Sequence, residues 1–87
     1  MASTRQRKRL GERIVKARKD RGWDQQTLAR AAEINPGYLS YIERGLKQPS
    51  LSTLHKLRNA LSLQDEVFWS WVDLLAPEDS SNGGEAA

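Results

Sequence analysis

Residues that start and end helices recur at short intervals through the middle of this chain, and they limit every helix there to a few turns. Gly22 ends a first helical pattern, and Asp24 is a good N-cap for a second helix. Asn35-Pro36 is the strongest start signal, because Asn caps a helix and Pro fits the first helical position, where no N–H is needed. Gly45 ends that third helix. Helices this short are unstable alone, so they must be stabilised by packing against one another.

Apolar residues recur at helical spacing within each segment that these signals define. Ser50 caps a fourth helix, and a fifth helix begins near Asp65 and stops at Pro77. The residues expected to face the core from the first four helices are Leu10, Ile14, Ala17, Leu28, Ala29, Ala32, Leu39, Ile42, Leu51, Leu54, Leu57 and Leu61. The sequence lacks alternating β-branched runs, so no strand is predicted. The pattern predicts an all-α fold of five helices, with the second near residues 25–32 and the third near residues 36–44.

Charge is divided unevenly along the chain. Its 87 residues suffice for one small domain. Residues 1–58 contain 14 Lys and Arg against five Asp and Glu, a net charge of +9, whereas residues 59–87 contain six acids and no base, a net charge of −6. A basic body with an acidic end indicates a polyanionic partner for the body.

Four parts are predicted along the chain. Residues 1–9 form a flexible basic arm, residues 10–63 form the folded domain, residues 64–76 form a C-terminal helix, and residues 77–87 form a disordered acidic tail without large apolar residues. The basic residues of the arm are Arg5, Arg7, Lys8 and Arg9.

The composition excludes several classes of function. The chain has no Cys and one His, His55, so disulfides, thiolate metal sites and His pairs are excluded, and we expect no metal and no cofactor. No apolar run approaches the roughly 20 residues of a membrane span, and no secretory signal follows the basic N-terminus. We therefore expect a soluble, cytoplasmic protein with no membrane partner and no evident small-molecule ligand. An enzyme is not expected, because no Ser/His/Asp, Cys/His or paired-carboxylate arrangement and no Gly-rich phosphate loop is present.

Two short helices that meet across Glu33-Ile34-Asn35 give the outline of a helix-turn-helix. Residues 10–63 resemble the Cro/phage-repressor helix-turn-helix family, also called the XRE family. The matching residues are Arg18, Gly22-Trp23-Asp24-Gln25, Leu28-Ala29, Ile34-Asn35, Leu39-Ser40-Tyr41-Ile42-Glu43-Arg44-Gly45, Pro49-Ser50 and Leu54. The resemblance implies a five-helix, lambda-repressor-like DNA-binding domain. In its small stand-alone form the chain is similar to phage repressors and to the controller proteins of restriction–modification systems.

The resemblance also implies a recognition helix at residues 36–44, which lies in the major groove with its first residues at base edges. The candidates for base contact are Asn35, Pro36, Gly37, Tyr38, Ser40, Tyr41 and Arg44. Relatives often carry Arg, Gln or Thr at the first positions, whereas Pro36 and Gly37 offer no side-chain donor. Direct readout of bases therefore depends on the remaining polar groups. DNA shape and phosphate contacts then contribute a larger share of the recognition. Alternatively, the two tyrosines could be core residues and Arg44 could only balance a helix C-terminus.

Phosphate contacts have their own candidates. Gln25 matches a family glutamine that contacts a DNA phosphate, and the free amides at a helix N-terminus suit a phosphate oxygen. The full set is Gln25, Lys47, Gln48, Arg7, Lys8 and Arg9. The basic arm could also be solvated charge or could enter the minor groove, and Lys47 and Gln48 could belong to a solvated loop.

Three further residues have structural roles under the resemblance. Arg18 and Glu43 match a family pair that forms a partly buried ion pair between the first and third helices. Glu33 replaces the Gly that often joins the two central helices, so the turn is expected to manage without a left-handed residue.

The fifth helix is apolar nearly all round. Phe68, Val72 and Leu75 form one stripe for the core, with Trp71 beside it. This stripe leaves Val67, Trp69 and Leu74 unexplained. We expect a homodimer through this helix, as in small relatives of the family, because exposed apolar patches mark interfaces. The interface candidates are Val67, Phe68, Trp69, Trp71, Val72 and Leu75. The alternative is a single, larger contact with the core.

These observations predict a sequence-specific transcriptional regulator that binds double-stranded DNA, most simply a nucleoid-associated repressor acting as a homodimer on a palindromic operator. One alternative is the antitoxin of a toxin–antitoxin pair, with the apolar fifth helix and the acidic tail holding the toxin. Another alternative is a transcription cofactor that bridges proteins.

Overall fold

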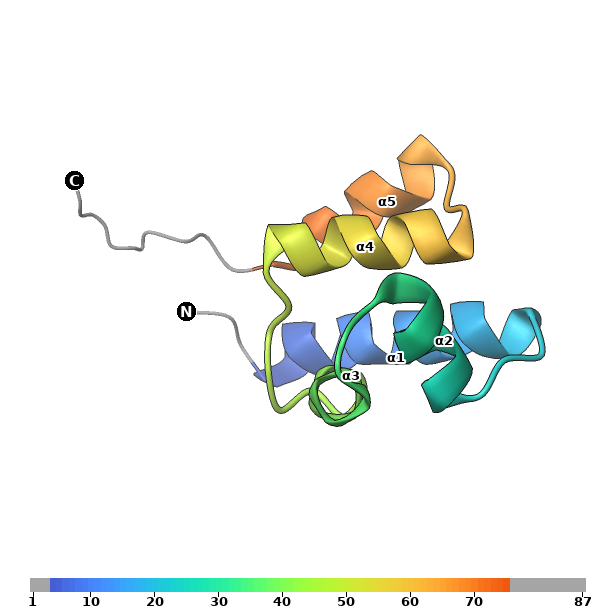
Figure 1. The fold of residues 1–87 in the computed structure, drawn as a ribbon. Coiled ribbons are helices and arrows are strands. Elements are labelled where there is room, and N and C mark those ends of the chain that lie inside the picture. Colours follow the sequence, from blue (N-terminus) through green and yellow to red (C-terminus); the bar gives the residue numbers. More distant parts are fainter. Residues whose placement is uncertain (1–3, 76–87) are drawn as a thin grey trace.

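The computed structural model describes residues 4–75, which form five α-helices and no β-strand. The helices are α1 (Thr4–Asp20), α2 (Gln25–Ala32), α3 (Pro36–Glu43), α4 (Leu51–Leu61) and α5 (Asp65–Val72) (Figure 1). The predicted all-α fold is therefore confirmed. The acidic tail predicted at residues 77–87 lies outside the described residues. Among residues 4–75, no helix has the length and the apolar character required to cross a bilayer.

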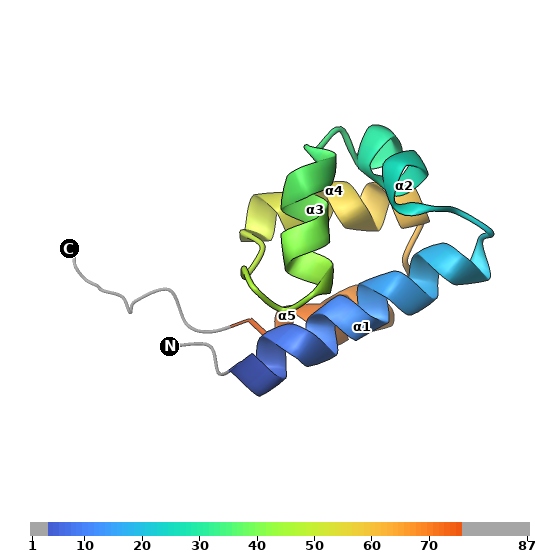
Figure 2. The same cartoon turned by 90° about the horizontal axis from the view of Figure 1, so that it is seen from below.

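Two layers of helices enclose the core. In Figure 1, α4 and α5 lie above, and α1 and α3 lie below. Helix α1 packs against α3, α2 contacts both α3 and α4, and α4 packs against α5. Figure 2 views the molecule from below, with α1 and α3 nearest the reader and α4 behind α3. Helix α3 is therefore covered on its inner side and open on its lower side.

Apolar side chains from all five helices meet between the layers. The buried apolar residues are Leu10, Ile14, Leu28, Ala29, Ala32, Leu39, Ile42, Leu54, Leu57, Leu61, Phe68 and Trp71. Leu51 was predicted to join them, but it is 48% exposed because it is the first residue of α4 and precedes the turn that faces the core. Ala17 packs against the core while remaining partly exposed.

Side-chain caps begin three of the helices at the predicted residues. The carboxylate of Asp24 accepts a hydrogen bond from the Thr27 N–H (2.8 Å), and Ser50 caps α4 in the same way. The Asn35 side-chain oxygen accepts from two amides in the first turn of α3, which opens with Pro36. The hydrogen bonds from Thr27 hold the pKa of Asp24 below its ordinary value of 3.8. The helix boundaries thus follow from local hydrogen-bond chemistry.

The turn between α2 and α3 contradicts one prediction. Glu33 has φ 58° and ψ 45°, so the residue expected to avoid the left-handed region occupies it. The chain must reverse immediately after Ala32, and the Ile34 N–H donates to the Ala29 carbonyl (3.0 Å), one turn back. This bond caps the end of α2 and offsets the cost of about 1 kcal/mol that left-handed backbone imposes on a non-glycine residue.

The N-terminal basic segment is helical rather than a flexible arm, because α1 begins at Thr4. The Arg7 Nε donates to the carbonyl oxygen of Gly45 (3.2 Å) and a second Arg7 nitrogen donates to the Thr4 hydroxyl (3.3 Å). Gly45 lacks a side chain at this contact, where a Cβ would lie 2.6 Å from the Lys8 Cγ. The first turns of α1 are therefore ordered by packing against the α3–α4 loop, a long-range contact that the sequence pattern did not reveal.

Gly11 sets the approach of α1 to α3. A Cβ at this position would lie 2.3 Å from the carbonyl oxygen of Glu43 and 2.7 Å from that of Ile42. The two backbones thus touch at a point that only glycine permits. The sequence analysis did not identify this contact, although a glycine inside an otherwise helical pattern could have indicated it.

Gly11→Ala should destabilise the protein, although Ala is the better helix former by about 1 kcal/mol. The added methyl group would force α1 and α3 apart, and overpacking of this kind costs about 1–3 kcal/mol. Thermal unfolding followed by circular dichroism measures the change. Ser52→Ala, at an exposed position of α4, is the control and should leave the melting temperature nearly unchanged. A Gly11→Ala variant as stable as the wild type would contradict the close contact.

Candidate nucleic-acid interface

Helices α2 and α3 are joined by a turn of only three residues, 33–35, and pack against each other. Leu28 of α2 and Leu39 of α3 are completely buried in the shared core. Each short helix thereby gains the packing that its length requires. The pair has the helix-turn-helix connection that the sequence predicted.

The outer side of α3 carries most of the candidates for base contact. Leu39 and Ile42 point into the core, and residues one position away along the helix turn outward. The exposed candidates are Asn35, Pro36, Gly37, Tyr41 and Arg44, and the partly buried candidates are Tyr38 and Ser40. Tyr38 also packs against the core, so its side chain lies partly in the core and partly at the surface.

Tyr41, Arg44 and Lys47 form a cation–aromatic cluster at the C-terminal end of α3. The Arg44 guanidinium lies 5.2 Å from the Tyr41 ring centre, and the Lys47 amine lies 5.6 Å from it. The Arg44 Nε also reaches back to the Ser40 carbonyl oxygen (3.4 Å). Positive charge is therefore gathered beside an exposed aromatic ring, which suits both phosphate and base contacts.

The predicted partners Arg18 and Glu43 lie together between α1 and α3. Arg18 donates two hydrogen bonds to the carboxylate (2.8 and 3.0 Å), and the two side chains are 13% and 3% exposed. The hydrogen bond with Glu43 raises the pKa of Arg18 above its ordinary value. Gln25 Nε2 donates to the same carboxylate (2.8 Å), so this network joins α1, α2 and α3. The bond from Gln25 was not predicted, because it depends on the relative position of three helices.

Apart from Gln25 on α2, the candidates for phosphate contact lie on two neighbouring segments. Lys8 and Arg9 are exposed on α1, and Lys47 is exposed in the α3–α4 loop, where Gln48 is partly buried. Figures 1 and 2 show the start of α1 beside this loop, and the hydrogen bond from Arg7 to Gly45 joins the two segments. Arg7 is therefore part of the fold, whereas its two exposed neighbours extend the basic surface around the end of α3.

The dimer-interface candidates on α5 separate into two groups. Phe68 and Trp71 are 1% and 3% exposed in the core of a single chain, so their assignment to an interface was wrong. Phe68 packs against the His55 ring, with centres 4.8 Å apart. Val67 and Trp69, in contrast, are 39% and 59% exposed. Val72 and Leu75 are partly buried and pack against the core.

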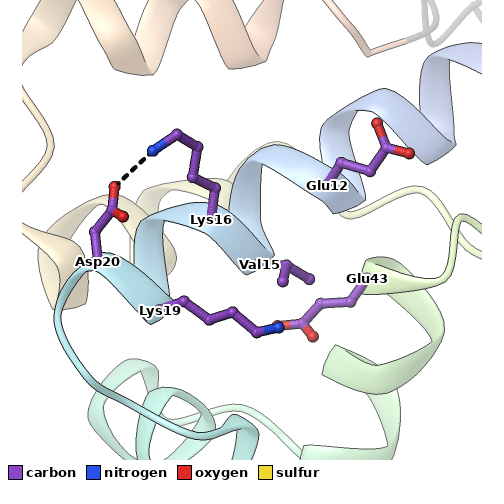
Figure 3. A pocket seen from close by; sticks show the side chains of 6 residues that line it. All are labelled: Glu12, Val15, Lys16, Lys19, Asp20 and Glu43. Atoms are coloured by element: carbon purple, nitrogen blue, oxygen red, sulfur yellow. Dashed lines mark hydrogen bonds and ion pairs between the residues drawn. The ribbon is translucent and has the colours of Figure 1, made fainter.

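A hollow of about 460 Å³ lies beside α1 (Figure 3). Its lining residues are Glu12, Val15, Lys16, Lys19, Asp20 and Glu43. An exposed ion pair between Lys16 and Asp20 (3.1 Å) forms part of the wall, and the Glu43 carboxylate is already held by Arg18 and Gln25. Within residues 4–75, no group of three His, Cys, Asp or Glu side chains is arranged to hold a metal ion.

Comparison with known sequences identifies the same central region. A helix-turn-helix family model matches residues 14–68. The HTH-type transcriptional regulator y4dJ of Sinorhizobium fredii is 31% identical over 78 residues, which cover 90% of this chain and 94% of that protein. The immunity repressor protein of Bacillus phage phi105 is 44% identical over 55 residues, or 63% of this chain. The chain spans 38% of the length of that repressor.

Two solved structures resemble the fold. The restriction–modification controller protein C.AhdI from Aeromonas hydrophila has a TM-score of 0.70 and 28% identity, covering 75% of this chain and 94% of its own. The clp gene regulator ClgR from C. glutamicum has a TM-score of 0.68 and 32% identity, covering 78% of this chain and 88% of its own.

Removing either partner of the Arg18–Glu43 pair should leave a buried charge without its counterion. Arg18→Met and Glu43→Gln are each expected to destabilise the protein by about 3 kcal/mol. The double variant should lose clearly less than the sum of the two single losses, because neither charge is then stranded. Urea denaturation at neutral pH measures all four proteins, and strictly additive losses would argue against the coupling.

Proposed function

The chain belongs to the XRE-type helix-turn-helix family of DNA-binding transcriptional regulators, which are not enzymes, and from this membership we propose that it recognises a specific operator in double-stranded DNA through α3. The observation that carries the proposal is the two-sided character of α3. Its inner side is fixed by Leu39, Ile42 and the buried Glu43, and its outer side exposes Gly37 and the cation–aromatic cluster.

In this proposal, α3 enters the major groove with its first residues at base edges. Base contacts come from the outer side of α3, and phosphate contacts come from the basic surface around its ends. The phosphate-binding residues are Gln25 at the start of α2, Lys8 and Arg9 on α1, and Lys47 and Gln48 after α3. Nine of the 14 basic residues precede Gly22, so most of the charge contributes affinity rather than specificity.

We further propose that two copies of the chain bind a palindromic operator, with half-sites about one helical turn (~34 Å) apart or a multiple of that distance. Val67 and Trp69, the exposed large apolar residues of α5, contribute to the contact between the copies. Helix α5 lies on the opposite side of the molecule from α3 (Figure 1), so a second copy bound there leaves the outer side of α3 open to DNA. Occupancy of such an operator represses transcription by blocking polymerase, a role supported by the similarity to a phage immunity repressor.

Binding to DNA should weaken as the salt concentration rises. With about six to ten phosphates contacted, affinity for a duplex selected from random DNA should fall on the order of 10³–10⁵-fold between about 50 and 200 mM salt.

Binding should also depend on the outer side of α3. Lys47→Ala should weaken binding to all sequences and reduce the slope of log affinity against log salt concentration by about 1. Tyr41→Ala should mainly reduce the preference for the selected duplex. Fluorescence anisotropy measures these affinities.

The control for these variants is Lys56→Ala, which removes an exposed charge on α4 outside the proposed interface and should leave affinity and slope unchanged. An affinity that does not respond to salt, or equal losses for Lys56→Ala and Lys47→Ala, would contradict the proposed binding mode.

Trp69→Glu should convert the protein from dimer to monomer while leaving its helices intact, because a charge would then occupy the apolar contact. Light scattering at micromolar concentration measures the mass, and circular dichroism measures the helical content. Leu46→Glu changes another exposed apolar residue, 58% exposed in the α3–α4 loop, and should not alter the mass. A strictly monomeric wild type would rule out the dimer and leave the DNA-binding proposal to its own test.

A further inference from the structure

The N-terminal half of the outer side of α3 offers few hydrogen-bonding groups. Pro36 and Gly37 are both exposed and have no polar side chain. Major-groove readers of adenine or cytosine need an acceptor for the exocyclic amino group of the base. The chemistry of this surface therefore limits which base edges it can satisfy.

Asn35 contributes only a donor to this surface. Its Oδ1 accepts hydrogen bonds from the N–H groups of Gly37 (2.7 Å) and Tyr38 (3.2 Å), which cap α3. Bidentate recognition of adenine by Asn requires both the carboxamide oxygen and the nitrogen, and here the oxygen is already occupied. The Nδ2 group can still donate to a base acceptor.

Gly37 leaves a notch on the helix surface. A Cβ at this position would meet no atom within 4 Å other than the Asn35 Oδ1, at 3.0 Å. Tyr41 lies one turn further along the same side, is 43% exposed, and has the cations of Arg44 and Lys47 close to its ring. The space left by the missing Gly37 side chain is thus open to a small group, and Tyr41 follows one helical turn later on the same side.

Glu33 has the carboxylate nearest in sequence to the notch. It lines a different hollow, with Lys56 and Asn59 of α4. Glu33 is therefore part of a surface that α4 also forms.

Building on the proposed function, we propose that the first turn of α3 reads thymine. The C5-methyl group of thymine occupies the Gly37 notch against the Tyr41 ring, and the thymine O4 accepts a hydrogen bond from Asn35 Nδ2. Thymine is the base that presents both a methyl group and an acceptor in the major groove. Guanine presents acceptors without the methyl group, and the amino groups of adenine and cytosine would meet no free acceptor on Asn35.

The test begins with duplexes selected from random DNA by the full-length chain. Each thymine of the enriched duplex is then replaced in turn by deoxyuridine, which pairs identically and lacks only the methyl group. At one or two thymines in each half-site, this replacement should weaken binding about fourfold, the value of one buried methylene-sized group. Replacement at the other thymines should have little effect.

Two variants connect this effect to the chain. Gly37→Ala fills the notch, so its affinities for the thymine and deoxyuridine duplexes should become equal. A merely structural defect would instead weaken both duplexes and leave their ratio unchanged. Asn35→Ser keeps a capping oxygen but removes the Nδ2 donor, and it should bind the enriched duplex about fivefold more weakly. Asn59→Ser, at an exposed position of α4, is the matched control and should bind normally.

The outcomes separate this inference from the proposed function. An enriched duplex whose thymines are all insensitive to replacement by deoxyuridine, or an unchanged ratio for Gly37→Ala, would overturn thymine reading while sequence-specific binding stands. Failure to enrich any duplex, together with the absence of salt-dependent binding, would overturn the proposed function and this inference with it.

Discussion

The carboxylate of Glu43 connects three of the five helices. It belongs to α3, accepts two hydrogen bonds from Arg18 of α1, and accepts a third from Gln25 of α2. A carboxylate that is 3% exposed would be strongly destabilising without these partners, so the pairing restricts where α3 can lie relative to its neighbours. Gly11 restricts the same arrangement sterically, because it lets the α3 carbonyls touch the backbone of α1. Charge pairing and close contact together fix the orientation of α3.

Because α3 is held in this orientation, its outer side presents a defined set of chemical groups. Leu39 and Ile42 are committed to the core, so the groups that reach outward are few and their directions are set by the helix. The first turn is uncharged, and the cation–aromatic cluster lies at the C-terminal end, so positive charge is confined to one end of this short helix. Helix α5 lies on the opposite side of the molecule from α3, so the proposed DNA binding and the proposed association between chains would not compete for one site (Figure 1).

Local hydrogen-bond chemistry explains which parts of the fold could be predicted. Asp24, Asn35 and Ser50 cap their helices as expected, since a cap needs only the side chain and the amides that follow it. The errors concern long-range contacts. Residues 4–9 are helical because Arg7 binds Gly45, and Phe68 and Trp71 are buried because α5 packs on α4, contacts that join distant parts of the chain. Glu33 adopts the left-handed conformation despite its side chain, because the chain reverses directly after α2 and the Ile34 N–H then caps that helix.

The sequence by itself determined the helices, their order and the family, because caps, glycines, prolines and apolar spacing act over a few residues and leave a readable pattern. Only the tertiary structure decided which groups of the interface are available. The Asn35 oxygen is occupied by its own helix, the Gln25 amide nitrogen donates one hydrogen bond to Glu43, and two cations lie close to the ring of Tyr41. Such availability depends on distances between side chains in the folded chain, and residue identity along the sequence does not specify those distances.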